Sequence, residues 1–458
     1  MSVLSFSNLI KSKTPIHMIG IGGVSMSSIA RALKYKGAQV SGSDSTASDM
    51  TELLAREGIP VTIGHSEDNV PEGAFVIYTA AIHPDNAERQ QAAKKGLVSV
   101  ERAVALGSLM SEYPSVICVA GTHGKSSTSG MLAAMAMCLE LDPTFMIGAA
   151  LPGLDSGFRR GDSGLFIAEA CEYFNSFLHF SADVAVILNV EHDHVDFFAT
   201  FADYRESFRK FIAGLRPGGT VCVNADAAGA LQCAAGSACN CLTFGLQAGE
   251  LRALDIKSEP DGMRFCVQYR DMRVDNVRLR AFGKHNVYNA LGAMAALLSL
   301  GYPLESIAAA LGAYTGLHRR MEFLGLLAPD IPVFDDYAHH PSEIAVSLAA
   351  VRDMGCRRII CAFQPHTYSR TAGLLDEFAA ALREVDVLFL ADIYAAREQN
   401  TLGISSGDLA CRIEGAQHVS EFAQIAQRIR ATAQPGDIVI TMGAGDIYKI
   451  AQLILPPQ

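Results

Sequence analysis

Residues 115–127 read Ser-Val-Ile-Cys-Val-Ala-Gly-Thr-His-Gly-Lys-Ser-Ser, the most informative segment of the chain. It predicts an apolar strand (115–120) that enters a glycine loop and is followed by a helix over 127–139. Successive N–H groups of such a loop point inward at an anion, and the positive end of the next helix faces the same point. Lys125 adds a mobile charge for the outer phosphates, and Ser126 adds an oxygen for magnesium. The stretch therefore predicts a loop that binds nucleotide phosphates.

The match to the common phosphate-loop pattern is incomplete. In GxxxxGK[ST] the first glycine falls on Val119. A glycine turn beside a surface lysine is the simpler alternative, but the strand–loop–helix setting favours nucleotide binding. The predicted ATP contacts here are Gly121, Thr122, His123, Gly124, Lys125, Ser126 and Ser127.

A second glycine loop, Gly20-Ile-Gly-Gly23, follows an apolar run near the N-terminus and precedes a helix predicted over 26–36. In dinucleotide-binding folds such glycines admit a pyrophosphate, and an acid at the end of the next strand, here Asp44, meets a ribose. The third glycine of GxGxxG falls on Ser25. Spacing alone therefore leaves open whether the diphosphate belongs to NAD or to a UDP-sugar. The predicted contacts are Gly20, Gly22, Gly23, Ser25 and Asp44.

Apolar strands alternate with helices along most of the chain, which indicates parallel sheets covered on both faces. With 458 residues the chain exceeds one ordinary core, and about three domains are expected. We predict an α/β protein of three domains, with an N-terminal Rossmann-like domain (1–107), a central domain resembling P-loop ATPases (108–316) and a Rossmann-like C-terminal domain (317–458). Residues 220–282 are expected to form an antiparallel edge of the central domain.

The composition limits the function classes. The net charge of −11 argues against a general affinity for nucleic acid or anionic membranes. No apolar run approaches the roughly 18 residues that a spanning helix needs, and the first residues, MSVLSFSNLIKSK, lack the features of a secretory signal. The eleven cysteines are scattered and never form CxxC, so buried free thiols such as Cys118, Cys222 and Cys361 are expected. A cytoplasmic protein without nucleic-acid partners or membrane insertion is predicted.

Three further clusters of polar residues are candidate ligand-binding positions, and two of them come directly after apolar strands. They are Glu169-Ala-Cys-Glu172, Asn189-Val-Glu-His-Asp-His-Val-Asp196 and Asp335-Asp-Tyr-Ala-His-His340. Parallel sheets present ligands at the carboxyl ends of their strands. Carboxylates near a phosphate loop suit Mg²⁺, which prefers oxygen ligands. The His-Asp-His run could instead belong to a zinc site or to a capped, solvated turn.

Together these segments resemble the Mur ligase family. The resemblance runs from Ile16 to Lys449 and rests on GIGGVSMSSIA, AGTHGKSST, EACEYFNSFL, NVEHDHVDFF, GKHNVYNALGA, DDYAHHPSEI, FQPHTYSRT, DIYAARE and GAGDIYK. It implies ATP-dependent ligation of L-alanine to the lactyl carboxylate of UDP-N-acetylmuramate through an acyl phosphate, for peptidoglycan synthesis. ATP and Mg²⁺ are the implied cofactors, and the implied assembly is a monomer or homodimer.

The resemblance also implies roles for single residues. The backbone around Gly22 and Gly23 would hold the UDP diphosphate rather than NAD. Ser126 and Glu169 would bind one Mg²⁺, and His194 would help to hold a second, although imidazole is an unusual magnesium ligand. Lys125, His194, Arg320 and His340 form the predicted catalytic set, in which either histidine could take the proton from alanine.

Further contacts are implied in the last third of the chain. Adenine would meet His285, Asn286 and Asn289, the γ-phosphate would meet Arg320, and the ATP ribose would meet Asp336. His339, His340 and Arg370 are the candidates for alanine and the reacting carboxylate. Simpler readings exist: His285 and Arg320 could be surface residues, and the two histidines could shape the turn before Pro341.

Two positions depart from the family pattern. Ser126-Ser127 stands where Thr-Thr is common, and the retained hydroxyls should preserve metal binding. Thr367 stands where many members carry arginine, which leaves Arg370 as the main candidate for the carboxylate of the amino acid.

Three rival functions stay open on sequence grounds. One is the family activity that attaches a murein tripeptide to the same nucleotide sugar. Another is a nicotinamide-dependent oxidoreductase, which would leave the Lys125 loop without a purpose. The last is a nucleotide-binding sensor of the same fold, in which Lys125→Ala would have little effect.

Overall fold

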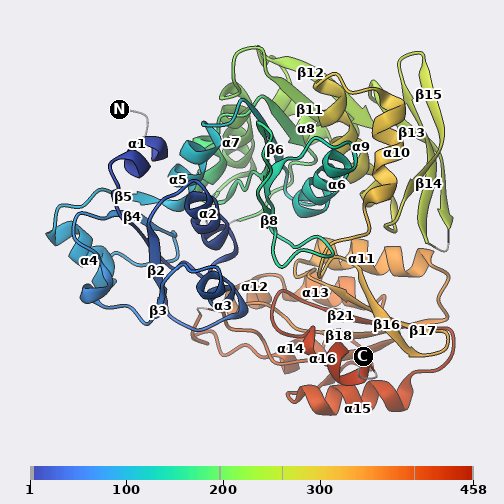
Figure 1. The fold of residues 1–458 in the computed structure, drawn as a ribbon. Coiled ribbons are helices and arrows are strands. Elements are labelled where there is room, and N and C mark those ends of the chain that lie inside the picture. The colour runs from blue at the N-terminus through green and yellow to red at the C-terminus, as the bar shows by residue number, and fades with distance from the viewer. Residues whose placement is uncertain (1–4, 195–196, 260, 397, 456–458) are drawn as a thin grey trace. The chain divides into compact units, whose positions relative to one another are not determined.

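The computed structural model describes residues 5–194, 197–259, 261–396 and 398–455. Its strands form three sheets of five, ten and six strands, each combined with helices (Figure 1). The chain divides into two compact units. The first comprises 1–252, 268–272 and 289–313, and the second comprises 253–267, 273–288 and 314–458.

The N-terminal sheet has the order β3-β2-β1-β4-β5, and its strands are all parallel. The chain leaves β1 toward β2 on one side and later returns to β4 on the other, so the carboxyl end of β1 lies at a topological switch point. The first glycine loop occupies that position. The strands are β1 (Ile16–Ile19), β2 (Val40–Asp44), β3 (Val61–Ile63), β4 (Phe75–Tyr78) and β5 (Ser99–Glu101). The helices are α1 (Phe6–Lys11), α2 (Val24–Tyr35), α3 (Asp49–Arg56), η1 (Glu67–Asn69), α4 (Ala87–Lys94) and α5 (Arg102–Met110).

The central sheet has the order β15-β14-β13-β12-β11-β10-β6-β9-β7-β8. The buried strand β6 lies between β10 and β9, which both run parallel to it. The strands are β6 (Ser115–Ala120), β7 (Thr144–Met146), β8 (Phe158–Arg159), β9 (Leu165–Glu169), β10 (Val184–Ile187), β11 (Thr220–Asn224), β12 (Asn240–Gly245), β13 (Leu251–Glu259), β14 (Gly262–Tyr269) and β15 (Met272–Leu279). The helices are α6 (Lys125–Cys138), η2 (Tyr173–His179), α7 (Phe201–Ala213), α8 (Ala228–Ala234), α9 (Lys284–Ser299), α10 (Leu304–Ala310) and η3 (Leu311–Ala313).

The prediction of an antiparallel edge over 220–282 is wrong for the first part of that range. β11 pairs with β12 in parallel, and β12 pairs in parallel with the start of β13. The strands after these, β14 and β15, complete the edge of the sheet.

The C-terminal sheet has the order β16-β17-β21-β18-β19-β20, and only β16 pairs antiparallel with its neighbour. The strands are β16 (Glu322–Ala328), β17 (Ile331–Asp336), β18 (Arg358–Phe363), β19 (Val387–Leu390), β20 (Gln417–His418) and β21 (Asp437–Met442). The helices are α11 (Pro341–Asp353), α12 (Tyr368–Gly373), α13 (Leu375–Leu382), α14 (Ser406–Ala410), α15 (Phe422–Thr432) and α16 (Lys449–Ile454).

The predicted α/β class is confirmed, and the three sheets agree with the predicted three-domain architecture. All eleven cysteines are free, and Cys118, Cys222 and Cys361 are buried within strands, as predicted. Among the helices of the described residues, none combines the length and apolar character needed to cross a membrane.

Candidate functional site

The phosphate loop joins β6 to α6 and is shaped by two glycines. Gly121 and Gly124 have φ angles of 146° and 84°, a region that side chains disfavour. A Cβ atom on Gly124 would also collide with the side chain of Asn289. Because α6 begins at Lys125, its first N–H groups face the loop. The two glycines therefore let the chain turn sharply from β6 into α6, and Asn289 of α9 lies beside the loop.

The segment after β10 holds this loop in place. The Asn189 side chain accepts from the N–H of His123 (2.8 Å) and donates to its backbone oxygen (3.1 Å). Thr122 Oγ1 donates to the backbone oxygen of Glu191 (3.0 Å) and lies 3.0 Å from the hydroxyl of Tyr204. Two clusters far apart in the sequence thus meet at the phosphate loop.

A buried carboxylate holds Lys125. The lysine Nζ lies 3.1 Å from Glu172 Oε2 and donates to two backbone oxygens of its own loop, at 2.5 and 3.0 Å. The Glu172 side chain is 0% exposed. Its Oε1 lies 3.4 Å from His194 Nε2 and accepts from the hydroxyl of Tyr204 (3.1 Å). Lys125, Glu172 and His194, from three segments, therefore form one charged cluster.

These contacts shift the pKa values of both partners. Burial raises the pKa of Glu172, but the charge of Lys125 and the hydrogen bond from His194 outweigh it, and the pKa is about 2. Burial lowers the pKa of Lys125, yet nearby carboxylates, first Glu172, hold this pKa above its ordinary value. The pair is therefore ionised at neutral pH. No role was predicted for Glu172, because the sequence does not show which acid of the cluster faces the lysine.

Ser126 and Glu169 border one small space beside Gly148. A Cβ atom on Gly148 would stand 3.0 Å from Glu169 Oε2 and 3.3 Å from Ser126 Oγ. The other carboxylate oxygen of Glu169 accepts from the Gly148 N–H at 2.6 Å. A hydroxyl and a carboxylate on one space fit Mg²⁺, which takes one or two protein oxygens and completes its shell with phosphate oxygens and water. Ser127, at the third position of α6, is half-buried.

The His-Asp-His run divides between two roles. His192 Nε2 lies 3.0 Å from the backbone oxygen of Phe198, whereas His194 faces Glu172 and stacks on Tyr173 with ring centres 4.3 Å apart. Val195 and Asp196 lie outside the described residues. Among the residues that are described, no three His, Cys, Asp or Glu side chains converge on a metal position. The contact of His194 with a second metal ion stays a prediction.

The N–H groups of the first glycine loop are hydrogen-bonded to other atoms of the protein. Three of those in 20–23 donate to backbone oxygens at 2.8, 2.9 and 3.3 Å. The fourth, from Gly22, donates to Asp44 Oδ2 at 2.9 Å. Asp44 thus lies at the loop, where its carboxylate accepts a hydrogen bond from the loop itself. The N–H groups left for an anion are those in the first turn of α2, which contains Ser25.

In the second unit, Asp336 is buried at the carboxyl end of β17. Its oxygens accept from two backbone N–H groups (3.1 and 2.7 Å) and from the hydroxyl of Ser347 (3.2 Å). Burial raises the pKa of Asp336 to about 6, against the charge of Arg320. The Arg320 guanidinium lies 5.3 Å from the ring centre of Tyr337. Asp336 organises the backbone here, and its contact with the ATP ribose stays a prediction.

The two adjacent histidines differ. His340 is the N-cap of α11, and its Nδ1 accepts from the Ser342 N–H at 3.4 Å, which matches the simpler reading of a turn. The ring of His339 lies 5.8 Å from that of His366, and Arg370 Nη1 lies 3.4 Å from His366 Nδ1. Burial, with the charges of His339 and Arg370, lowers the pKa of His366 to about 4. His366 joins the cluster although the sequence analysis did not select it.

Thr367 stands next to this cluster, at the N-cap of α12. It has a φ of 65° and donates its N–H to the backbone oxygen of Tyr394 at 2.9 Å. The ring of Tyr394 stacks on His366 with centres 5.7 Å apart. His366 therefore has the ring of Tyr394 and the guanidinium of Arg370 as neighbours.

The predicted adenine contacts fall in both units. His285 and Asn286, at the start of α9, belong to the second unit. Asn286 Nδ2 donates to the backbone oxygen of Phe282 (2.8 Å) and lies 3.0 Å from His285 Nε2. Burial lowers the pKa of His285 to about 4. Asn289 belongs to the first unit.

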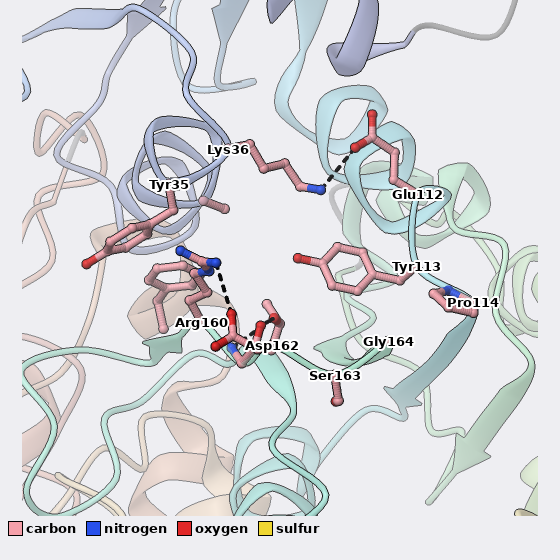
Figure 2. Close-up of a pocket in the computed structure, with 13 residues that line it drawn as sticks. Tyr35, Lys36, Glu112, Tyr113, Pro114, Arg160, Asp162, Ser163 and Gly164 are labelled. Carbon is pink, nitrogen blue, oxygen red and sulfur yellow. Dashed lines mark hydrogen bonds and ion pairs between the residues drawn. The ribbon is translucent and has the colours of Figure 1, made fainter.

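A cavity of about 380 Å³ lies at the other end of the central strands. Its lining includes the residues just before β6 and β9, whereas the phosphate loop and Glu169 lie at the carboxyl ends of those strands. Figure 2 shows two ion pairs on its walls, Lys36 with Glu112 (3.1 Å) and Arg160 with Asp162 (2.9 Å). Because each cation is already matched by a carboxylate, this cavity does not offer the excess positive charge that phosphates need.

Three family models match consecutive parts of the chain. They are described as Mur ligase family, catalytic domain (residues 15–114), Mur ligase middle domain (119–297) and Mur ligase, glutamate ligase domain (319–445).

Individual proteins match over nearly the whole chain. The UDP-N-acetylmuramate–L-alanine ligase of Acetivibrio thermocellus is 42% identical over 96% of this chain and 95% of its own length. The enzyme of the same name from Clostridium acetobutylicum is 40% identical over 96% and 97%.

Two solved structures share the architecture. The UDP-N-acetylmuramate-alanine ligase of Thermotoga maritima has a TM-score of 0.82 at 26% identity, over 96% of this chain and 98% of that one. A murein peptide ligase of Psychrobacter arcticus has a TM-score of 0.74 at 25% identity, with the same coverage.

Proposed function

Because the chain belongs to the Mur ligase family, we propose that it joins L-alanine to the lactyl carboxylate of UDP-N-acetylmuramate and converts ATP to ADP and phosphate. The observation that carries this proposal is the Lys125–Glu172 pair at a glycine loop, beside the Ser126–Glu169 space. The names of the relatives support alanine as the amino acid. The cytoplasm, where ATP is made, is the proposed compartment.

The proposal assigns one substrate to each predicted domain. Residues 1–107 would bind the nucleotide sugar through the first glycine loop, and 108–316 would bind ATP. Residues 317–458 would receive alanine at the cluster of His339 and Arg370. The remaining assignments of the sequence analysis are kept: His285, Asn286 and Asn289 for adenine, Asp336 for the ribose, and Arg320 for the γ-phosphate.

A carboxylate must be activated before an amine can attack it. We propose that an oxygen of the lactyl carboxylate attacks the γ-phosphorus of ATP, and that the bond to the β-phosphate oxygen breaks to release ADP. Lys125 would stabilise the charge on the transferring group, since phosphoryl transfer depends mainly on positioning and electrostatics. Ser126 and Glu169 would hold Mg²⁺, which neutralises phosphate charge when bound.

The amine of alanine then attacks the acyl carbon of the acyl phosphate. The amide bond forms, inorganic phosphate leaves, and one proton passes from the nitrogen to a base. His194 and His340 are the candidates. His194 already contacts Glu172, whose negative charge would stabilise the imidazolium that results.

The test is ATP-dependent phosphate release, measured with UDP-N-acetylmuramate and one amine donor at a time. L-alanine should give the highest kcat/KM, above glycine, L-serine and the murein tripeptide L-Ala-γ-D-Glu-meso-diaminopimelate. A preference for the tripeptide would replace the proposal with murein peptide ligation. If no donor led to phosphate release, the proposal of ligase activity would be refuted.

A further inference from the structure

Arg102 connects the two glycine-loop regions of the first unit. It is the first residue of α5, and its guanidinium donates to two serine hydroxyls. Nη1 donates to Ser25 Oγ at 3.2 Å, and Nη2 donates to Ser176 Oγ at 3.5 Å. Ser25 lies in the first turn of α2, after the first glycine loop, and Ser176 lies in η2, just after Glu172. The cation therefore lies between the predicted nucleotide-sugar loop and the carboxylates of the phosphate site.

The charge of Arg102 is poorly matched by acids. Within the described residues, its ion pair is with Glu101, whose Oε1 is 3.8 Å from the arginine Nε. The other oxygen of Glu101 accepts from the N–H of Ala103 and so caps α5. Arg31 makes a useful contrast, because Glu57 binds it through two hydrogen bonds of 2.8 and 2.6 Å. Of these two arginines, Arg102 keeps the greater free positive charge.

Arg102 is 21% exposed at its side chain, so an incoming anion can still reach it.

The first glycine loop needs a cation from elsewhere. The segment GIGGVSMSSIA contains no lysine or arginine, and the N–H groups of 20–23 bond within the loop and to β2. Asp44 adds a negative charge at the Gly22 N–H. A diphosphate would therefore rely on the first turn of α2, where Ser25 holds Arg102. Arg102 is the cation that the structure places at this turn.

We propose that Arg102 binds the diphosphate of the nucleotide sugar and exchanges its serine partners for phosphate oxygens. This inference rests on the proposed function, because it takes the first glycine loop as the nucleotide-sugar site. Arginine suits the role since its planar donors can bind two phosphate oxygens at once. Ser25 and Ser176 hold the side chain in position before the ligand arrives.

The test is calorimetric titration of the full-length protein with UDP and with uridine. Arg102→Ala should weaken UDP binding by about 10- to 100-fold, the range for a charge-assisted hydrogen bond, and should leave uridine binding unchanged. Arg102→Lys should recover part of the loss, because it keeps the charge without the planar donors. Arg31→Gln is the matched control, since Arg31 also reaches the central sheet region, through Ser156 Oγ at 2.6 Å. It should bind UDP like the wild type.

ATP binding and the melting temperature of each variant show that the protein remains folded. Equal UDP affinity in folded Arg102→Ala and wild type would overturn the inference and leave Arg102 as a structural link. A loss seen with UDP-N-acetylmuramate but not with UDP or UDP-N-acetylglucosamine would also overturn it, because the contact would then be to the lactyl carboxylate. A wild type that binds none of these nucleotides would refute the proposed function itself.

Discussion

The two glycine loops of the first unit begin alike and end differently. Each follows a buried parallel strand and precedes a helix with few charges. The loop at Gly121–Gly124 is followed at once by Lys125, which a fully buried acid, Glu172, holds in its charged state. The loop at Gly20–Gly23 has no cation of its own, and Asp44 occupies one of its N–H groups.

Under the proposed function, one backbone motif serves two kinds of phosphate. A reacting γ-phosphate needs a mobile charge in the loop itself, where the charge can follow the transferring group. A diphosphate that only anchors a substrate can be held by the first turn of a helix and a cation from another element. Under the proposed function, the charge beside each loop, rather than its glycines, distinguishes the reacting site from the anchoring site.

The largest effect should come from Lys125→Ala. It removes the charge proposed to stabilise phosphoryl transfer, and ADP formation should fall by at least about 1,000-fold. Coupled-enzyme assay of ADP measures the loss. Lys36→Ala is the control, since Lys36 is also ion-paired, with Glu112, but lines the remote cavity. If Lys125→Ala kept more than a tenth of the wild-type turnover, Lys125 would not be the charge that distinguishes the reacting loop from the other loop.

Glu172→Gln should reduce kcat by about 100-fold and leave the KM for the nucleotide sugar unchanged. Without the carboxylate, burial lowers the pKa of Lys125, so the lysine loses its proton at a lower pH. The alkaline limb of the kcat–pH profile should therefore move to lower pH. An unshifted alkaline limb, in a variant of reduced activity, would show that Glu172 does not control the charge of Lys125.

Glu88 is a buried acid of α4, beside the N-terminal sheet, and should affect stability rather than turnover. Its carboxylate accepts from Ser43 Oγ (2.6 Å) and Asn69 Nδ2 (2.7 Å) and lies 3.0 Å from His17 Nε2. Burial raises its pKa, but these partners outweigh burial and lower the pKa from 4.5 to about 2. Glu88→Gln should cost about 2 kcal/mol of unfolding free energy at pH 7, measured by urea denaturation.

The pH dependence of this cost has a defined sign. A carboxyl with a lowered folded-state pKa contributes stability that is complete above the unfolded value of 4.5 and is lost as the pH falls through about 2. The difference in unfolding free energy between wild type and Glu88→Gln should therefore shrink as the pH falls from 4.5 to about 2. A difference in unfolding free energy that stays constant from pH 7 to pH 2 would contradict an ionised Glu88 in the folded protein.

The smallest effect is expected from Gly22→Ala. The new Cβ atom would stand 2.8 Å from Thr51 Cγ2 and 2.9 Å from Asp44 Oδ2, so the first loop must shift. UDP affinity should fall by about 10-fold, the equivalent of about 1.4 kcal/mol. ATP affinity, measured with a non-hydrolysable analogue, should remain within the experimental error. Equal losses for both nucleotides would show that the two loops are not independent sites.

The sequence predicted the local features of both loops because they depend on neighbouring residues. The strand over 115–120 has the predicted bounds, and the helix expected from residue 127 begins at Lys125. The helix expected over 26–36 spans Val24–Tyr35. Apolar runs and glycine positions are enough for such assignments.

The side-chain partners could not be predicted, because they depend on how distant segments meet. Glu169 and Glu172 are three residues apart, and a kink with left-handed φ angles at Phe174 and Asn175 follows them. Only the fold shows that Glu172 faces Lys125 while Glu169 faces the Gly148 N–H. Arg102 carries no motif at all, since its importance comes from two serines 77 and 74 residues away.

The most direct test follows an oxygen atom from the sugar to the phosphate. UDP-N-acetylmuramate labelled with ¹⁸O in its lactyl carboxylate is incubated with ATP, Mg²⁺, L-alanine and the protein, and the inorganic phosphate is analysed by mass spectrometry. Transfer of the γ-phosphoryl group to the carboxylate predicts one ¹⁸O in each phosphate released. Amide formation with unlabelled phosphate, or with the label in AMP, would contradict an acyl phosphate formed at the Lys125 loop.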